Sequence, residues 1–182
     1  MNTYEDEIYK FVATKENFKS AIEISNLLPE IKGRLITDFW DLVKNEIEDY
    51  INKNGKNWVL SMKKDGHLYI DINNQKDLRI YFAGRYGKCY YGIGSNNYKN
   101  GLLDEKRVEK YINEEALYKE MKKTSWSVCW IEFNQENFTN IQTLIKILPE
   151  ERDVFKDEIV NHILNFTIEN EIHIEQFCKM RK

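Results

Sequence analysis

The stretch LYIDINNQKDLRIYF, residues 68–82, decides the fold class of this chain. It contains two runs, 68–72 and 78–82, in which residues of opposite character alternate, the pattern of a half-buried β-strand. A similar run, 58–62, precedes it, and the intervening Asp65-Gly66 is a hairpin signal. The stretch therefore predicts three neighbouring antiparallel strands.

Two further strands are expected downstream. Four of the eight glycines cluster around residues 89–93, which favours a tight turn and an irregular fourth strand. Residues 125–133 predict a fifth strand, and a polar helix is expected before it, over about 104–123. The prediction is an α+β fold: an antiparallel sheet of about five strands with helices on one face, flanked by helical arms at both ends.

Both arms carry the same two tripeptides. Glu-Asn-Phe begins at Glu16 and at Glu136, and Leu-Pro-Glu begins twelve residues later in each case, so the copies superpose at an offset of 120. Each arm therefore predicts a helix, a proline-marked break and a longer helix. The similarity fits a duplication and equally fits two unrelated helical hairpins. Apolar residues expected to pack the arms on the sheet are Phe18, Ile24, Phe39, Phe138, Leu144 and Phe155.

We interpret the chain as a single domain of 182 residues with a basic centre between acidic arms. Residues 57–102 contain three acidic and seven basic residues, net +4, and six of the 11 tyrosines, whereas residues 1–56 carry −3 and residues 103–182 carry −4. Cations bind phosphates and flat rings stack on bases, although such a surface can equally grip an acidic protein. The candidate contact surface, on the outward face of one strand and the turn after it, comprises Arg79, Tyr81, Arg85, Tyr86, Lys88 and Tyr90.

No catalytic site, metal site or cofactor is predicted. The three histidines lack the spacing of metal ligands. Glu-x-Lys occurs at Glu30 and Glu120, in predicted helical or helix-break contexts rather than on the strand where a metal-dependent nuclease needs that pair. Gly92-Ile93-Gly94 lacks the third glycine of a dinucleotide fingerprint and is interpreted as a turn.

Two tyrosine-bearing segments resemble a nuclease signature. Ile80-Tyr81 and the later Tyr90-Tyr91-Gly92-Ile93-Gly94-Ser95 look like the paired motifs of GIY-YIG nucleases, in which two strands present tyrosines to a scissile phosphate. The sequence departs from that family because Arg79 replaces the first glycine and no arginine directly follows Ser95. The resemblance implies, as an alternative, a degenerate metal-dependent nuclease.

A second resemblance covers most of the chain. The order of a Leu-Pro-Glu break, Asp38-Phe39-Trp40, a hairpin, Tyr91-Gly92-Ile93, the tryptophans Trp126 and Trp130 and a terminal amphipathic helix is similar to the carboxy-terminal accessory region of PD-(D/E)XK superfamily proteins. Their nuclease core is absent, so this resemblance implies a non-catalytic recognition module. In size and composition the chain is also similar to phage-encoded inhibitors such as anti-CRISPR proteins.

The expected compartment is the cytoplasm. Three cysteines, 40 and 49 residues apart, form no C-x-x-C pair, the first residues do not form a signal peptide, and no window approaches 18 consecutive apolar residues. We expect a non-enzymatic protein, away from membranes, that engages nucleic acid or a nucleic-acid-processing enzyme. Its most concrete form is a phage-side inhibitor of a bacterial defence nuclease. A structural adaptor is a further alternative, and the oligomeric state stays open.

Overall fold

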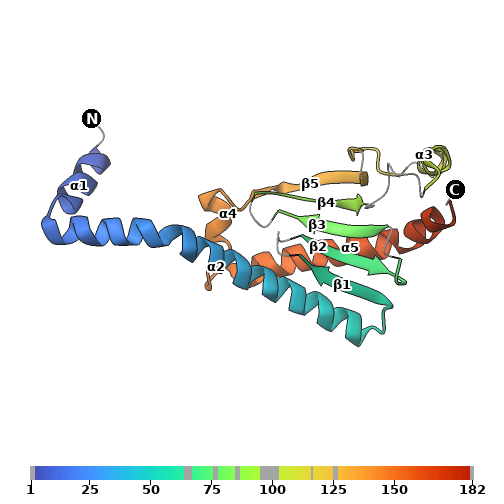
Figure 1. The fold of residues 1–182 in the computed structure, drawn as a ribbon, viewed down its shortest axis with the longest axis horizontal. Helices are drawn as coiled ribbons and strands as arrows, with labels where there is room; N and C mark the ends of the chain where they lie inside the picture. The colour runs from blue at the N-terminus through green and yellow to red at the C-terminus, as the bar shows by residue number, and fades with distance from the viewer. Residues whose placement is uncertain are drawn as a thin grey trace. The chain divides into compact units, whose positions relative to one another are not determined.

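The computed structural model describes residues 3–63, 67–75, 78–84, 87–94, 103–115, 117–124 and 127–180 (Figure 1). The chain forms two compact units, Met1–Leu35 and Ile36–Lys182. Its elements, in order, are α1 (Thr3–Val12), α2 (Lys15–Lys53), β1 (Trp58–Met62), β2 (Leu68–Ile72), β3 (Arg79–Ala83), β4 (Lys88–Gly94), α3 (Glu105–Glu114), β5 (Ser127–Asn137), α4 (Ile141–Ile145) and α5 (Arg152–Lys179).

The sheet is antiparallel throughout and its strands follow chain order, β1-β2-β3-β4-β5 (Figure 1). The predicted α+β class is therefore confirmed, and the first three strands lie where the alternating runs placed them. The backbone N–H of Lys63 donates to the carbonyl of His67 at 2.9 Å, which closes the β1–β2 hairpin. The predicted Asp65-Gly66 turn itself lies outside the described residues.

One face of the sheet is covered by α5 and by the part of α2 that belongs to the second unit. Trp40 of α2 meets Phe82 of β3 at 5.4 Å between ring centroids, and Phe39 stacks on Phe155 of α5 at 5.4 Å. Leu78, Ile80 and Phe82 face these helices as predicted and are at most 1 % exposed. The expected burial of Phe39, Phe138, Leu144 and Phe155 is also confirmed.

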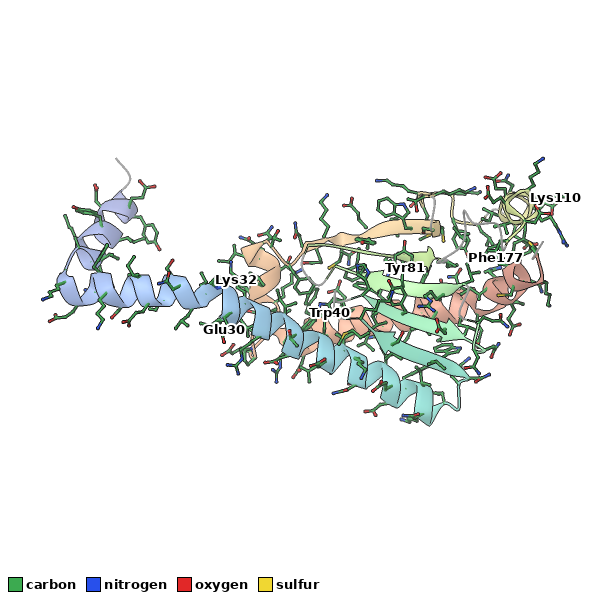
Figure 2. The ribbon with its side chains drawn as sticks, viewed as in Figure 1. Glu30, Lys32, Trp40, Tyr81, Lys110 and Phe177 are labelled. Carbon is green, nitrogen blue, oxygen red and sulfur yellow. The ribbon has the colours of Figure 1, made fainter. Side chains whose placement is uncertain are left out.

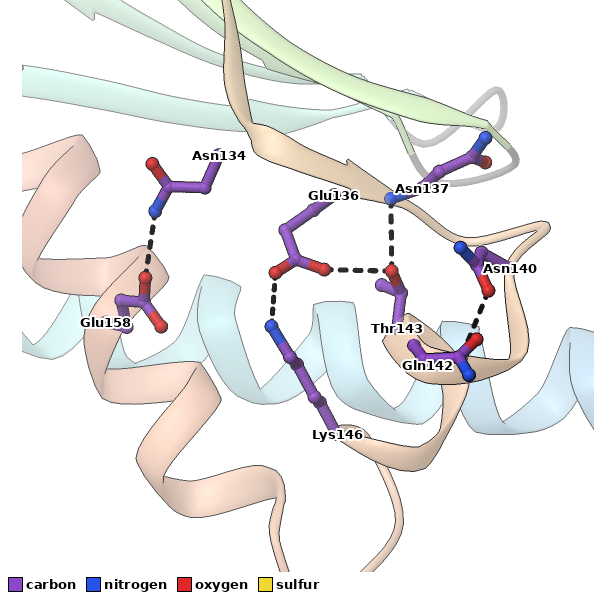
Figure 3. Close-up of polar contacts among 8 residues, drawn as sticks. All are labelled: Asn134, Glu136, Asn137, Asn140, Gln142, Thr143, Lys146 and Glu158. Atoms are coloured by element: carbon purple, nitrogen blue, oxygen red, sulfur yellow. Dashed lines mark hydrogen bonds and ion pairs between the residues drawn. The ribbon is translucent and has the colours of Figure 1, made fainter.

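A buried carboxylate fastens α4 to the end of β5 (Figure 3). Glu136 is 8 % exposed, accepts a hydrogen bond of 2.8 Å from the Thr143 hydroxyl and forms an ion pair with Lys146. The same hydroxyl accepts the backbone N–H of Asn137 at 3.1 Å. These contacts give the buried carboxylate of Glu136 its hydrogen-bond partners and link the end of β5 to α4.

The predicted break at Pro29 is wrong, whereas the break at Pro149 is confirmed. Pro29 lies inside the continuous helix α2, and Pro149 lies in the turn between α4 and α5. A proline in a helix removes one N–H, which leaves the carbonyl of Ser25 without its helical donor. Both Pro29 and Ser25 are exposed, so water can satisfy that carbonyl and the helix continues.

The predicted helix over about 104–123 is also too long. Asp104 caps α3 by accepting the backbone N–H groups of Lys106 and Arg107, as expected for a helix start, but the helix ends at Glu114. Tyr118 has a left-handed φ of 56° and its hydroxyl donates to Asn170 of α5. This tertiary contact holds the segment as turns, and sequence periodicity does not reveal it.

The first unit differs from the rest in exposing its apolar side chains. Phe18 is 57 % exposed and Ile24 is 62 % exposed, so the expectation that these two residues pack on the sheet is wrong. Within the described ranges, no helix is both long enough and apolar enough to cross a bilayer.

Candidate functional site: the aromatic face of the sheet

Aromatic side chains line the face of the sheet that lies opposite α2 and α5. The strand register puts Tyr69 opposite Tyr81, Tyr81 opposite Gly92, and Gly92 opposite Trp130. Tyr90 meets Tyr81 at 6.1 Å and Trp130 at 6.0 Å, both edge to face. We call Tyr69, Tyr81, Tyr90 and Trp130 the aromatic face, because edge-to-face contacts join its last three members into one surface.

Gly92 lies between two large rings of this face. A Cβ atom on Gly92 would meet the carbonyl oxygen of Cys129 at 2.0 Å and the Cα of Trp130 at 2.9 Å. Those are backbone atoms that cannot move aside, so only glycine lets β5 approach β4 this closely. As a result no side chain separates Tyr81 from Trp130 along that row.

Tyr81 lies on the predicted face of β3 but is buried. It is 2 % exposed, and its hydroxyl lies 3.0 Å from the Ser127 hydroxyl. Burial raises the pKa of Tyr81 well above its usual value. The expectation that Tyr81 offers an exposed stacking ring is therefore wrong, and the structure assigns it to supporting Tyr90 from beneath the surface.

Arg79 is an ion-pair partner rather than an open cation. Its Nε lies 3.1 Å from Oδ1 of Asp71, and the two side chains are only 12 % and 9 % exposed. Its guanidinium also lies 5.1 Å from the centroid of the Tyr69 ring. Charge-assisted pairing in this sheltered position neutralises much of the positive charge that the sequence predicted for the site.

Two of the predicted residues, Lys88 and Tyr90, line a cavity of about 240 Å³. Among the described residues, Thr124, Trp130 and Glu132 also line it, and we call this cavity the aromatic pocket. The Lys88 side chain is 65 % exposed, and its Nζ lies 3.4 Å from Oε2 of Glu132. The described part of the pocket thus combines aromatic walls with the Lys88 cation and the Glu132 carboxylate.

A second cation lies on the Trp130 ring. Lys122 exchanges two backbone hydrogen bonds of 2.8 Å with Trp130, and its Nζ lies 4.9 Å from the ring centroid. The indole N–H of Trp130 is buried, and no residue in the described ranges accepts a hydrogen bond from it.

Arg85 and Tyr86, the remaining predicted contact residues, lie outside the described residues. Of the described residues on either side, the N–H of Gly87 donates a hydrogen bond of 3.0 Å to the carbonyl of Gly84. Gly84 has a φ of 138°, and a Cβ there would meet the Cα of Cys89 at 2.6 Å. This position therefore requires glycine.

Of the three tyrosines in the segments that resemble a GIY-YIG nuclease, Tyr81 and Tyr90 share one face of the sheet and Tyr91 lies on the other. Tyr91 is paired with Phe82 and contacts His162 at 4.3 Å and Phe166 at 4.9 Å, on the side of the helices. Tyr81 faces the other side. The hydroxyl groups of Tyr81 and Tyr91 therefore do not converge on one position.

Two of the three thiols and one histidine lie in packed surroundings. Cys89 and Cys129 are buried, and burial raises the pKa of each thiol to about 12. His162 lies against Tyr91 and Phe133, and its pKa is lowered, burial being the largest cause. Among the residues that the structure describes, no group of three or more His, Cys, Asp or Glu side chains is arranged to hold a metal ion.

Sequence reasoning missed Lys122, Thr124 and Glu132 and did not place Trp130 beside Tyr90. The alternation of Trp130 and Glu132 with apolar neighbours in β5 is visible in the sequence and puts both on one face. Which residues of β4 they oppose depends on the strand register, which shifts between Lys88 and Tyr90. Sequence periodicity alone does not give such a shift.

Comparison with models of protein families, with curated proteins and with solved structures finds no match to this chain. The functional interpretation therefore depends on the geometry of the aromatic face and its pocket.

Proposed function

We propose that this chain is a non-enzymatic binding protein that engages single-stranded nucleic acid by taking one base into the aromatic pocket. The observation that carries the proposal is the cavity of about 240 Å³ between Tyr90 and Trp130. Pockets for drug-sized ligands measure about 300–1,000 Å³, so this one suits a single planar ring. Stacking of a base on an aromatic side chain contributes roughly 1–3 kcal/mol.

The polar residues of the pocket suit a nucleotide. Glu132 provides a carboxylate that can accept a hydrogen bond from an exocyclic amine of a base. Lys88 is exposed beside it and Lys122 lies on Trp130, so both can approach the phosphates that flank a bound base. Lys88 is already paired with Glu132. Binding of a nucleotide therefore replaces the Glu132 carboxylate with a phosphate as the ion-pair partner of the Lys88 Nζ.

The salt dependence should be modest. The sequence suggested a strongly basic patch, but Arg79 is paired with Asp71 and nearly buried. With Lys88 and Lys122 as the main phosphate contacts, the slope of log affinity against log salt should be on the order of −1 to −2, from about 0.7 per phosphate on single strands. A steep slope would point instead to the residues that lie outside the described ranges.

The non-enzymatic part of the proposal draws on the arrangement of the tyrosines. A GIY-YIG mechanism needs two tyrosines directed at one phosphate. Here Tyr91 lies on the opposite face from Tyr81, and although Tyr90 shares the face of Tyr81, the Tyr81 ring is 2 % exposed and its hydroxyl lies 3.0 Å from the Ser127 hydroxyl. We expect no cleavage of single- or double-stranded DNA with Mg²⁺ or Mn²⁺. Cleavage that disappears in Tyr81→Phe or Tyr91→Phe would contradict this and support the nuclease alternative.

The binding test is a titration of a labelled single-stranded oligonucleotide, followed by anisotropy and by tryptophan fluorescence. Tyr90→Leu and Lys88→Glu should each weaken binding by about tenfold or more, a loss of about 1.4 kcal/mol. Lys110→Glu is the matched control, because Lys110 is an exposed lysine on α3 whose side chain is 74 % exposed (Figure 2). Quenching by the bound base should be reduced in Trp130→Phe. Equal affinity of the pocket variants and the Lys110 control would overturn the proposal.

A more specific form makes the chain a cytoplasmic, phage-side inhibitor of a bacterial defence nuclease, in the manner of anti-CRISPR proteins. It draws on the size and composition of the chain and on its resemblance to accessory regions of PD-(D/E)XK proteins. Co-expression with a DNA-targeting nuclease should then protect an invading plasmid, and the double variant Tyr90→Leu, Lys88→Glu should not. If the chain binds a protein partner without nucleic acid, and if the affinity does not change with salt, the adaptor alternative is favoured.

A further inference from the structure

Glu132 lies in the aromatic pocket beside both of its rings. It is directly opposite Tyr90 in the register of β4 and β5, and it follows Trp130 by two residues on the same face of β5. The rings of Tyr90 and Trp130 stand at 71° to each other, so a base stacks on one of them and meets the edge of the other. A base in the pocket therefore has the Glu132 carboxylate next to it.

The carboxylate of Glu132 is held by one weak interaction. The Lys88 Nζ lies 3.4 Å from its Oε2, and no residue in the described ranges donates a hydrogen bond to its Oε1. The Lys88 side chain is 65 % exposed, and an ion pair so open to water contributes little to stability. When Lys88 turns to a phosphate of a bound strand, both oxygens of Glu132 become available to the base.

Guanine is the base whose pairing edge fits two acceptor oxygens. Its N1–H and its N2 amine donate side by side in one plane, the same fork with which an arginine guanidinium meets a carboxylate. Adenine and cytosine present an amine next to a ring nitrogen that accepts, and thymine presents one N–H between two carbonyls. On those edges a carboxylate oxygen would face a lone pair and lose a hydrogen bond, which weakens binding.

The size of the pocket also suits guanine. The cavity of about 240 Å³ has room for one six-membered ring. In a purine this ring carries the pairing edge, and the sugar is attached to the other ring. Guanine can therefore place its N1 and N2 groups beside Glu132 while its sugar and phosphates stay outside, near Lys88 and Lys122.

We propose that the aromatic pocket selects guanine and that Glu132 determines this preference. The inference rests on the proposed function, because it names the base that the pocket takes from a single strand. Stacking on Tyr90 or Trp130 holds the base, and the Glu132 carboxylate accepts hydrogen bonds from its N1–H and its N2 amine. Lys88 then pairs with a flanking phosphate.

Strands that differ in one base test the preference. The probes are short thymidine oligonucleotides whose central base is guanine, adenine, cytosine or hypoxanthine, titrated with the full chain and followed by anisotropy. The guanine strand should bind about fivefold or more tightly than the adenine, cytosine and all-thymine strands, the discrimination of one bidentate contact to a base edge. A single guanine per strand avoids quadruplex formation. Equal affinity for all the strands would overturn the inference.

Hypoxanthine separates hydrogen bonding from stacking. It keeps both rings, the N1–H and the O6 of guanine and lacks only the N2 amine. The hypoxanthine strand should therefore bind severalfold more weakly than the guanine strand, because one oxygen of Glu132 is left without a donor. A guanine preference that hypoxanthine shares would come from stacking, which can favour guanine without any hydrogen bond, and would overturn the role of Glu132.

Glu132→Gln should change the preferred base. The amide has nearly the shape of the carboxylate but presents one acceptor and one donor, the pattern that matches adenine. The ratio of the affinities for the guanine and adenine strands should fall severalfold, to below one. Glu114→Gln is the matched control, because Glu114 also pairs with an exposed lysine, Lys110, at 3.6 Å and its side chain is 61 % exposed. An unchanged ratio in Glu132→Gln, or an equal fall in the control, would overturn the proposal.

Tyr90→Leu separates failure of this inference from failure of the proposed function. It should weaken binding of every strand, because all bases stack. If Tyr90→Leu weakens every strand and guanine is not preferred, the inference is wrong and the proposed function stands. If no strand binds, or if Tyr90→Leu binds as tightly as the unmodified chain, both are wrong.

A free guanine nucleotide offers the same pairing edge, and competition distinguishes it from a strand. Guanosine monophosphate should displace the guanine strand only weakly, because it lacks the second flanking phosphate. Displacement at equal concentrations would make a free nucleotide the ligand. That result would overturn the single strand as the ligand and keep Glu132 as the residue that recognises guanine.

Discussion

The two ends of the chain carry the same tripeptide, Glu-Asn-Phe, in different surroundings. Phe18 on α2 is 57 % exposed, whereas Phe138 after β5 is 2 % exposed and lies 5.7 Å from Trp40 between ring centroids. Glu16 is exposed, whereas Glu136 is buried against Thr143 and Lys146. Identical residues at the same spacing therefore have a core role at one end and a surface role at the other.

The two Leu-Pro-Glu segments differ in the same way. Pro29 lies within a helix whose sides are exposed, and Pro149 lies in the turn that precedes α5. The equivalent segments of the two copies adopt different secondary structures, so the 120-residue repeat does not mark two copies of one structural unit. What distinguishes the two ends is contact with the sheet, which local sequence does not specify.

Truncation should give the largest difference between the two parts of α2. Deleting residues 1–50 removes Phe39, Trp40, Val43 and Ile47, all at most 1 % exposed, and should abolish the cooperative melt. The loss of several core side chains at about 2–5 kcal/mol each exceeds the roughly 5–15 kcal/mol by which domains are stable. A chain that lacks residues 1–33 should still unfold cooperatively on heating. Circular dichroism measures the thermal unfolding of both truncated chains. Unfolding of the shorter truncation would show that the arm stabilises the body.

Single phenylalanine substitutions sharpen the comparison. Phe155→Ala should lower the free energy of unfolding by about 3–5 kcal/mol, because Phe155 is buried and stacks on Phe39. Phe18→Ala, measured by urea unfolding at a concentration where the chain is monomeric, should change it by less than about 0.5 kcal/mol. A large loss in Phe18→Ala would mean that this ring is covered in the monomer.

Glu136 and Glu16, the glutamates of the two Glu-Asn-Phe tripeptides, should also differ in how much they contribute to the free energy of unfolding. Glu136→Ala leaves the Thr143 hydroxyl and the Lys146 ammonium without their acceptor and should cost about 1–3 kcal/mol in urea unfolding. Glu16→Ala is the matched control at the exposed copy and should be close to neutral. Equal losses would contradict the structural role assigned to Glu136.

The smallest expected effect is a pH dependence at α5. Burial beside Tyr91 and Phe133 lowers the pKa of His162, against the opposing influence of Glu169 and Glu158. The unfolded chain then binds more protons than the folded one, so stability should fall as pH falls through the usual histidine range. The slope should stay below about 1.4 kcal/mol per pH unit, the value for one proton. His162→Gln should flatten the plot of unfolding free energy against pH between about pH 7 and 5.5. An unchanged slope would show that another group causes the pH dependence.

Periodicity in the sequence was sufficient for the first three strands and for the buried side of α2 in the second unit. The strands at 58–62 and 68–72 follow from alternation, and Phe39, Val43 and Ile47 follow from helical spacing. These patterns show which side of an element is apolar. Where that side packs on the sheet, its predicted burial was confirmed. On the arm the same spacing exists without burial, so Ile24 was placed in the core wrongly.

The sequence by itself determined the fold class, the alternating strands and the tyrosine-rich composition of the centre. Only the tertiary structure decided that Tyr81 is buried, that Asp71 neutralises Arg79 and that Tyr90 and Trp130 share a pocket. The physical reason is that each of these outcomes depends on contacts between strands: Asp71 meets Arg79 across neighbouring strands, and Tyr81 and Tyr90 meet Ser127 and Trp130 of β5, 40 or more residues away in the sequence. The register of these strands is set by bulges, close glycine contacts and the helices packed behind the sheet, and no short stretch of residues encodes it.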